Sequence, residues 1–483
     1  MFFAHFENRK FKRDFLCYNI PRDFRGLQGI PCNPLKSPEI LENGLLSRGN
    51  LIKYKNETGA NVKRSIFHSS CLRRKEVRMV SKRIQKALLG NSAIRAMFVE
   101  GKEMAAKYGA ENVYDFSLGN PATPAPEAFH AAVRDLLDTA DANGAAGSLA
   151  LHGYMENAGY KEVRQKIADN LNRRFGTKFD AHNLIMTVGA AGGINIIFKT
   201  ILDPGDEVIA FAPFFGEYRQ YAANFDAGLV TVQPDLHTFQ PDLADLEAKI
   251  TAKTKALIVN TPNNPTGVIY KPETMQSIGR ILEKKQKEYG TDIYLISDEP
   301  YRELVYDGNH EDFLTKYYKN TIVGYSFSKS LSLPGERIGY VVVPDEAADA
   351  GELIRGIEIS NRTLGFVNAP SLVQQAVARC LEEKTDVSFY DENRKMLYEG
   401  LTKLGFTCIK PEGAFYLWVK SPMEDEEAFV NEGKKFHLLM VKGGAFGCPG
   451  FVRLAYCVSH ETIERSLPAF AKLAESCGLT AEK

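Results

Sequence analysis

The segment of residues 325–340 holds side chains that can bind a phosphate group and react with a carbonyl compound. It opens at the end of an apolar run that predicts a short buried strand, and Ser326, Ser328 and Lys329 follow directly. Arg337 comes eight positions after the lysine. Hydroxyl groups and a guanidinium are good phosphate ligands, and a lysine amine forms a Schiff base once burial or a nearby cation lowers its pKa. An ordinary surface loop could carry the same residues, so the remaining chain has to decide between the two interpretations.

Other chemically useful residues also follow predicted strands. The run 184–188 leads into the glycine-rich stretch 189–193, and a helical apolar spacing begins at Ile194. A strand, a small-residue loop and a helix N-terminus together form an anion site, because free N–H groups and the helix dipole point at the ligand. A tight turn without a phosphate would look similar. The remaining runs end in polar or aromatic loops: 207–212 before Phe215, 255–259 before Asn264, and 293–297 before Asp298 and Tyr301.

The alternation of strands and helices predicts an α/β fold with a mostly parallel sheet. In such sheets the loops at the carboxyl ends of the strands hold the ligands. After about residue 365 the pattern changes to a smaller α+β unit. Its predicted elements are helices at 371–383, 389–404 and 461–475 and strands at 413–419, 438–441 and 451–455. With a strand at 113–118 and a helix at 92–108, we predict a small domain of residues 79–122 and 365–483 and a large domain of residues 123–364.

Composition and charge exclude several classes of protein. The chain of 483 residues is 44% hydrophobic and 25% charged, as in ordinary globular proteins, and its formal net charge is zero. The total charge therefore gives no reason to expect nucleic acid or an anionic membrane as a partner. No apolar run approaches the roughly 18 residues that a membrane span needs. Eight cysteines without a C-x-x-C motif indicate reduced thiols and a cytoplasmic protein.

The first 78 residues differ from the rest of the chain. They hold sixteen Lys and Arg against seven Asp and Glu, and four prolines interrupt them without any sustained periodicity. We interpret residues 1–78 as a basic extension that is mostly disordered, or as residues upstream of a true start at Met79. Their acidic residues make a poor transit peptide. A DNA-binding module is a further possibility, although no helix-turn-helix pattern is visible.

From about Met79 to its C-terminus the chain resembles the class I aminotransferases, which are fold-type I enzymes that depend on pyridoxal 5'-phosphate. The motifs that carry the resemblance occur in the family's order and at near-family spacing. They are Asn264-Pro-Thr-Gly, Asp298 with Tyr301, Ser326-x-Ser328-Lys329, Arg337-x-Gly339, and Arg453 in Phe-Val-Arg-Leu-Ala-Tyr.

The resemblance implies a role for each residue near the cofactor ring. Lys329 would bind the cofactor as a Schiff base and then shuttle the proton of the substrate Cα. Asp298 would pair with the pyridine N–H and keep the ring an electron sink. Asn264 and Tyr301 would donate to the ring hydroxyl oxygen, and Phe215 would stack on the ring. Catalysis is thus expected from Lys329, Asp298 and Tyr301.

For the phosphate, the resemblance implies Ser326, Ser328 and Arg337, with the backbone N–H groups of Ala190 and Ala191. The family often has Ser or Thr at the positions of these two alanines, so only main-chain donors remain there. No metal site is implied.

The resemblance also implies a homodimer with shared active sites. Tyr154 is similar to a tyrosine that reaches the phosphate of the neighbouring subunit. Gly119 and Arg453 are similar to the clamp on the substrate α-carboxylate, with Arg453 as a bidentate fork. Arg362 lies close to the arginine that grips the distal carboxylate in dicarboxylate-specific members, but it is shifted by one residue relative to Asn368.

The implied activity is the ping-pong transfer of an amino group from an L-amino acid to a 2-oxo acid. Aspartate, aromatic and broad specificity all remain open. A second interpretation keeps the cofactor and changes the reaction to that of a C–S lyase or a decarboxylase. A third is a transcription regulator with an aminotransferase-like body, which the basic residues 1–78 would suit.

Overall fold

The computed structural model describes residues 80–89, 93–310 and 312–480. The predicted basic extension, residues 1–78, lies outside the described residues. Those that are described belong to one compact unit of the chain. Across these ranges, no helix combines the length and the apolar character that a membrane crossing requires.

The larger sheet has seven strands in the order β2-β8-β7-β6-β5-β3-β4. All neighbouring pairs are parallel except those made by β8, which runs antiparallel to both β2 and β7. This confirms the predicted α/β fold with a mostly parallel sheet. The strands are β2 (Leu184–Thr187), β3 (Glu207–Phe211), β4 (Gly228–Val232), β5 (Thr254–Val259), β6 (Tyr294–Asp298), β7 (Thr321–Ser326) and β8 (Gly339–Val342).

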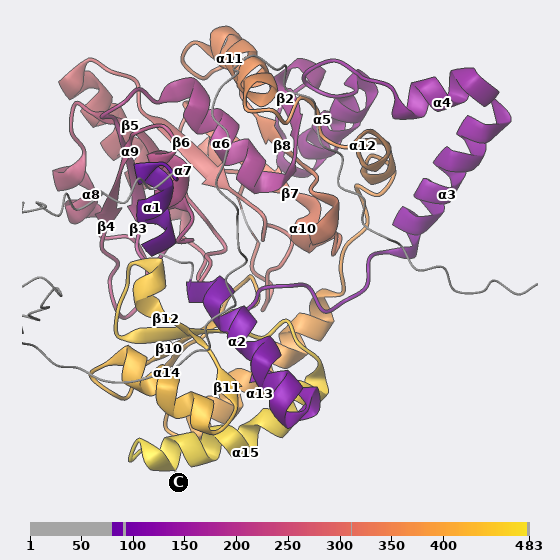
Figure 1. Cartoon of the computed structure of the whole chain (residues 1–483). Helices are drawn as coiled ribbons and strands as arrows, with labels where there is room; N and C mark the ends of the chain where they lie inside the picture. Colours follow the sequence, from indigo (N-terminus) through magenta and orange to yellow (C-terminus); the bar gives the residue numbers. More distant parts are fainter. Residues whose placement is uncertain (1–79, 90–92, 311, 481–483) are drawn as a thin grey trace, which may run out of the picture. The chain divides into compact units, whose positions relative to one another are not determined.

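Helices cover both faces of this sheet (Figure 1). Successive strand residues point to opposite faces, so Ile296 packs with α6 (Gly189–Ile201) and α11 (Ala350–Thr363), while its neighbour Leu295 packs under α9 (Pro272–Tyr289). Near β2, β8 and β7 that second face is covered by α5 (Lys161–Phe175), α12 (Ser371–Val377) and α3 (Glu127–Ala142). All strands except the edge strand β4 are therefore largely buried on both sides, as continuous apolar runs predict. The remaining α-helices near the sheet are α1 (Lys82–Leu89), α4 (Gly144–His152), α7 (Tyr218–Ala223), α8 (Leu243–Lys249) and α10 (Phe327–Ser330).

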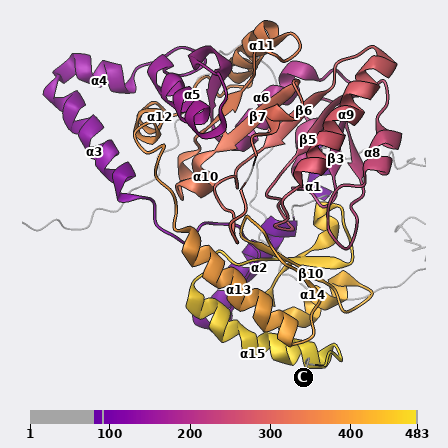
Figure 2. The same ribbon diagram turned by 180° about the vertical axis from the view of Figure 1, so that it is seen from behind.

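The C-terminal elements form a second group with the first strand of the chain. A four-stranded antiparallel sheet has the order β12-β13-β10-β9, and β1 (Tyr114–Asp115) pairs in parallel with β11 (Leu438–Leu439). Figure 2 shows α13 and α15 side by side on this group. The predicted division into a small and a large domain stays a prediction. The other elements of the group are β9 (Cys408–Ile409), β10 (Tyr416–Lys420), β12 (Val441–Lys442), β13 (Phe451–Ala455), α2 (Ala93–Tyr108), α13 (Val387–Lys403), α14 (Glu426–Lys435) and α15 (His460–Ser476).

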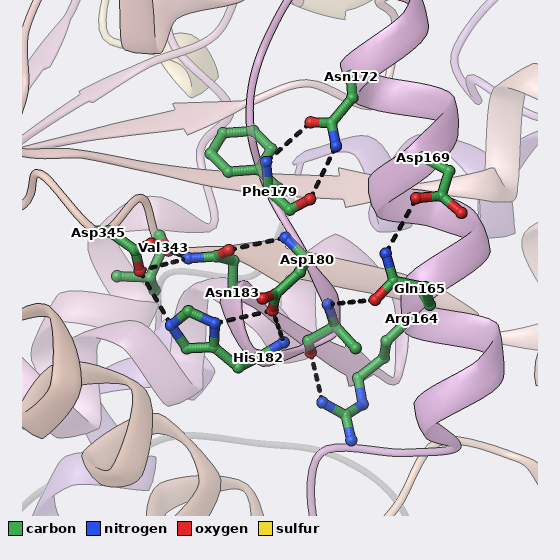
Figure 3. A network of polar contacts seen from close by, with 11 residues as sticks. Arg164, Gln165, Asp169, Asn172, Phe179, Asp180, His182, Asn183, Val343 and Asp345 are labelled. Carbon is green, nitrogen blue, oxygen red and sulfur yellow. Dashed lines mark hydrogen bonds and ion pairs between the residues drawn. The ribbon is translucent and has the colours of Figure 1, made fainter.

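A network of polar contacts anchors the edge strand β2 at its start (Figure 3). The Asp180 side chain accepts from the backbone N–H of His182 at 2.7 Å, and Asn183 Oδ1 accepts from the backbone N–H of Asp180 at 2.9 Å. Asn183 also donates to the carbonyl oxygen of Val343 at 3.0 Å, just beyond β8. Arg164 of α5 donates to the carbonyl oxygen of Ala181. These bonds fix β2 against α5 and β8, and so fix the position of the loop at its far end.

Candidate active site

The loops that follow β2, β3, β5, β6 and β7 meet around one cavity of roughly 250 Å³. This edge of the sheet is where parallel strands place their ligands. The structure brings twelve of the thirteen predicted site residues to the cavity wall: Gly119, Ala190, Ala191, Phe215, Asn264, Asp298, Tyr301, Ser326, Ser328, Lys329, Arg337 and Arg453.

Lys329 lies on α10, one residue past the serine pair, and is half-buried. Its Nζ donates to the carbonyl oxygen of Gly119 at 2.6 Å and lies 5.3 Å from the centre of the Phe415 ring. Burial lowers the pKa of the Lys329 ammonium to about 8, and the positive charge of Arg453 also lowers it. The amine can therefore gain and lose a proton near neutral pH.

Asp298 ends β6 and is only 5% exposed. Its Oδ2 accepts from the hydroxyl of Tyr218 at 2.5 Å, whereas its buried Oδ1 has no partner among the described residues. Burial raises the pKa of this carboxyl to about 7 although the Tyr218 bond opposes the shift. A buried oxygen without a donor is costly, so the site is built for a ligand that brings an N–H or O–H group.

A buried ion pair holds the turn that carries Asp298 and Tyr301. The Oε2 atom of Glu299 lies 2.7 Å from Nε of Arg302, and Ser297 donates to the other carboxylate oxygen at 2.6 Å. The Arg302 guanidinium also lies 4.3 Å from the centre of the Tyr325 ring, on the neighbouring strand β7. These contacts connect the turn after β6 to β7, and so fix the position of the Asp298 carboxylate relative to the lysine loop that follows β7.

Anion-binding groups gather at the ends of β2, β8 and β7, which are adjacent in the sheet. Helix α6 starts directly after β2 and has no side-chain cap, so the N–H groups of its first turn remain available. The hydroxyl groups of Ser326 and Ser328 lie 2.7 Å apart. Arg337 takes a left-handed conformation with φ of 51° before β8 and crosses above Gly189, where a Cβ would lie 2.8 Å from its Nη2. Glycine is favoured at position 189 because its own φ of 75° is one that residues with side chains rarely adopt and because the guanidinium lies close above it.

Arg453 on β13 is buried, 1% exposed, and its hydrogen-bond partners among the described residues are an amide and a carbonyl oxygen rather than a carboxylate. Its Nη1 donates to Asn264 Oδ1 at 3.0 Å and its Nη2 donates to the carbonyl oxygen of Ser117 at 2.5 Å, while Nε has no partner there. A desolvated cation that faces a cavity favours an anionic ligand, and a guanidinium binds a carboxylate best.

Comparison with known proteins agrees with this geometry. Residues 110–470 match the profile of the family described as Aminotransferase class I and II. The chain belongs to this aminotransferase family. It is therefore a transaminase of the α/β, fold-type I architecture, which confirms the predicted resemblance, fold and enzyme class. The family is generally dependent on pyridoxal phosphate.

Three relatives of this aminotransferase illustrate the similarity. An aminotransferase structure from Eubacterium rectale is 47% identical with a TM-score of 0.79, covering 83% of this chain and 99% of that one. Aspartate aminotransferase from Thermotoga maritima is 31% identical over 80% of this chain and 97% of its own. Aspartate/prephenate aminotransferase from Thermus thermophilus is 32% identical over 66% of this chain and 83% of its own.

Two predicted positions in the aminotransferase lie away from the cavity. Tyr154, in the loop after α4, is 95% exposed and does not line the cavity. Arg362, near the end of α11, is also exposed and outside it. The structure of one chain thus leaves both side chains free of its own site.

Sequence reasoning missed several cavity residues that carry no motif of their own. Tyr416 and Asn260 line the cavity, and Tyr221 joins them from α7. Asn260 donates to the carbonyl oxygen of Asp298 at 2.8 Å and accepts from the backbone N–H of Asn264 at 2.7 Å. Its place directly after a strand was the only available signal.

A cluster of four hydroxyl groups lies behind the lysine loop. Thr123 Oγ1 lies 2.6 Å from Thr385 Oγ1 and 2.9 Å from both Ser332 Oγ and the hydroxyl oxygen of Tyr390. Ser332 comes three residues after Lys329, while Thr385 and Tyr390 belong to the segment that enters α13. The cluster joins three distant stretches of chain directly beside the site.

Proposed function

We propose that the cavity binds pyridoxal 5'-phosphate, with covalent attachment at Lys329, and that the enzyme uses it to transfer amino groups in a ping-pong cycle. The observation that carries the proposal is the unpartnered Oδ1 of Asp298 in a cavity that also holds a lysine with a lowered pKa. Each neighbouring group can be tested for its fit to that cofactor.

The donors and acceptors present fit the cofactor at both ends. A pyridine N–H would satisfy Oδ1 of Asp298, and the carboxylate would keep that nitrogen protonated. A phosphate dianion suits the first turn of α6 together with Ser326, Ser328 and Arg337. Between them, Phe215 from the loop after β3 lines the cavity and presents an aromatic ring.

When bound, the cofactor supplies an electron sink that stabilises negative charge at the substrate Cα. The protein supplies the remaining steps. Lys329, with a pKa of about 8, accepts and returns the proton at Cα. Arg453 holds the α-carboxylate, so that the Cα–H bond keeps one orientation relative to the lysine. We propose Lys329, Asp298 and Tyr301 as catalytic residues.

We propose an amino acid with an acidic side chain as the first donor to test, with aromatic donors second. Support comes from the relatives named for aspartate and for aspartate and prephenate. The acceptor would be a 2-oxo acid such as 2-oxoglutarate.

A panel of amino donors tests the substrate class and the reaction together. The purified enzyme, saturated with pyridoxal phosphate, is mixed with one donor at a time, and the cofactor absorbance follows the half-reaction. We expect aspartate to convert the cofactor to its amine form and 2-oxoglutarate to restore it. Release of pyruvate and ammonia from a cysteine conjugate without any acceptor would instead indicate a C–S lyase.

We further propose a homodimer in which Tyr154 completes the phosphate site of the neighbouring subunit. Support comes from its exposure of 95% and from its absence from the wall of the cavity in its own chain. Mixing Tyr154→Ala chains with Lys329→Ala chains gives mixed dimers in which one site carries both lesions and the other carries none. Activity should recover to a fraction of wild type. Verified mixed dimers without recovery would show that each subunit builds its site alone.

Two other properties are proposed on more general grounds. Free cysteines at positions 380, 408, 448, 457 and 477 support a reducing, cytoplasmic location. The pairing of β1 with β11 supports a small domain of residues 79–122 and 365–483 and a large domain of residues 123–364.

A further inference from the structure

Tyr416 lies in the cavity wall and contacts both Tyr301 and Arg453. It begins β10 and is 2% exposed, with its side chain in the cavity wall. Its hydroxyl oxygen lies 2.7 Å from that of Tyr301, and its ring lies 4.5 Å from the Arg453 guanidinium. A Cβ on Gly119 would lie 2.1 Å from the Tyr416 hydroxyl oxygen, so only glycine leaves room for this ring.

The two phenols form an isolated pair. Within the described part of the chain, each hydroxyl has the other as its hydrogen-bond partner and no second one. A phenol carries a single proton, so only one of the two can donate within the pair. The hydroxyl that accepts then keeps its own proton free for a group in the cavity.

The surroundings decide which phenol donates. The Arg453 guanidinium lies over the ring of Tyr416, and a nearby cation makes a phenol more acidic. Burial raises the pKa of both phenols, and the positive charge of Arg453 opposes this rise. The more acidic hydroxyl is the better donor, so the position of the guanidinium over its ring favours Tyr416 as the donor and Tyr301 as the acceptor.

We infer that Tyr416 is a positioning residue that acts through Tyr301. By donating to Tyr301, it turns the Tyr301 proton into the cavity, toward the ring hydroxyl oxygen of a bound cofactor. The inference rests on the proposed function, because it concerns how this chain addresses pyridoxal phosphate. A hydroxyl that accepts one hydrogen bond donates a stronger one. With Tyr416 donating to Tyr301, the two phenols together would therefore stabilise negative charge on the ring hydroxyl oxygen of the cofactor.

The pH midpoint of the visible absorption of the holoenzyme tests this role without any turnover. A donor to the ring oxygen stabilises the deprotonated cofactor, so its loss should raise the midpoint. For Tyr416→Phe, which keeps the ring over Arg453, we expect a rise of about half a pH unit, roughly threefold in proton affinity. Tyr301→Phe should give a larger rise, and adding Tyr416→Phe to it should cause no further change. An ortho-fluorinated tyrosine at position 416, a stronger donor, should lower the midpoint.

Matched controls distinguish a positioning role of Tyr416 from a general effect of losing a buried phenol. Tyr306→Phe removes another buried phenol, one that donates to the carbonyl oxygen of Ala414 two residues before Tyr416, and should leave the midpoint unchanged. An unchanged midpoint in Tyr416→Phe, or an equal rise in the Tyr301→Phe background, would overturn the inference. If the wild-type protein shows no lysine-bound cofactor absorption, the proposed function itself fails, which is a distinct result.

Discussion

Replacing Lys329 by alanine should abolish both turnover and the visible absorption of the bound cofactor. In the proposed function the Lys329 Nζ, which lines the cavity and has a pKa of about 8, acts as the nucleophile and the proton carrier. Loss of a general acid–base group alone costs about 10²- to 10⁴-fold, and the loss of covalent attachment adds to it. We expect a fall in kcat of at least about 10⁴-fold in a steady-state assay with the best donor.

A lysine at the opposite end of the same strand provides the matched control. Lys319 is exposed and lies just before β7, so Lys319→Ala should keep wild-type activity and absorption. Small primary amines added to Lys329→Ala should restore part of the proton transfer and no covalent attachment. An intact absorption band in Lys329→Ala would refute the assignment of this residue.

Asp298→Asn should weaken catalysis and strengthen the cofactor-free fold at once. An amide keeps the shape of the side chain but removes the charge that, in the proposed function, keeps the pyridine nitrogen protonated, so kcat/KM should fall about 10²- to 10³-fold. In the cofactor-free chain the carboxylate is buried with one unpartnered oxygen. Removing that charge should raise the free energy of unfolding at pH 8, measured by urea denaturation.

The raised pKa of Asp298 determines how the free energy of unfolding should change with pH. The pKa of the Asp298 carboxyl is about 7 in the folded chain and 3.8 for the ordinary group. Between these two pH values the folded state therefore keeps a proton that the unfolded state has released. Wild-type stability should therefore fall as pH rises from about 4 to 7, by up to about 4 kcal/mol, and the variant should lack this loss. The two proteins should have equal stability near pH 4. Asp292, exposed just before β6, supplies the control Asp292→Asn, which should follow the wild type. A stability difference that does not change with pH would contradict the argument.

The elements with a clear period were predicted well from the sequence. The helix predicted at 389–404 is α13, and the helix at 461–475 is α15. The strand predicted at 113–118 is shorter in the structure, where it spans Tyr114–Asp115. The backbone N–H of Ser117 donates to the Asp115 carboxylate at 2.9 Å and so is not available for strand pairing. The helix predicted to reach 383 ends at Val377, where the chain tightens into shorter turns such as Cys380 N–H to the Val377 carbonyl at 2.9 Å.

Cavity residues could be predicted from the sequence where reactive side chains stand in a short motif at the end of an apolar strand. Asp298 could be placed at the cavity because it directly follows an apolar run, and Lys329 because it belongs to the short motif that follows the next apolar run. Tyr416 could not, because it is one aromatic in an apolar strand and its role depends on contacts with Tyr301 and Arg453. The hydroxyl cluster around Thr123 depends in the same way on residues more than 200 positions apart. Such pairings are properties of the folded chain and leave no local pattern.

The antiparallel pairing of β7 with β8 fixes both ends of the loop that carries the lysine and the arginine. Val323 pairs with Val342 and Ser326 with Gly339, so Lys329 lies three residues beyond one paired end and Arg337 two residues before the other. A one-residue slip would turn each side chain of these two strands to the opposite face of a sheet in which both strands are fully buried. The register of one strand pair therefore determines where both cations of the loop enter the cavity.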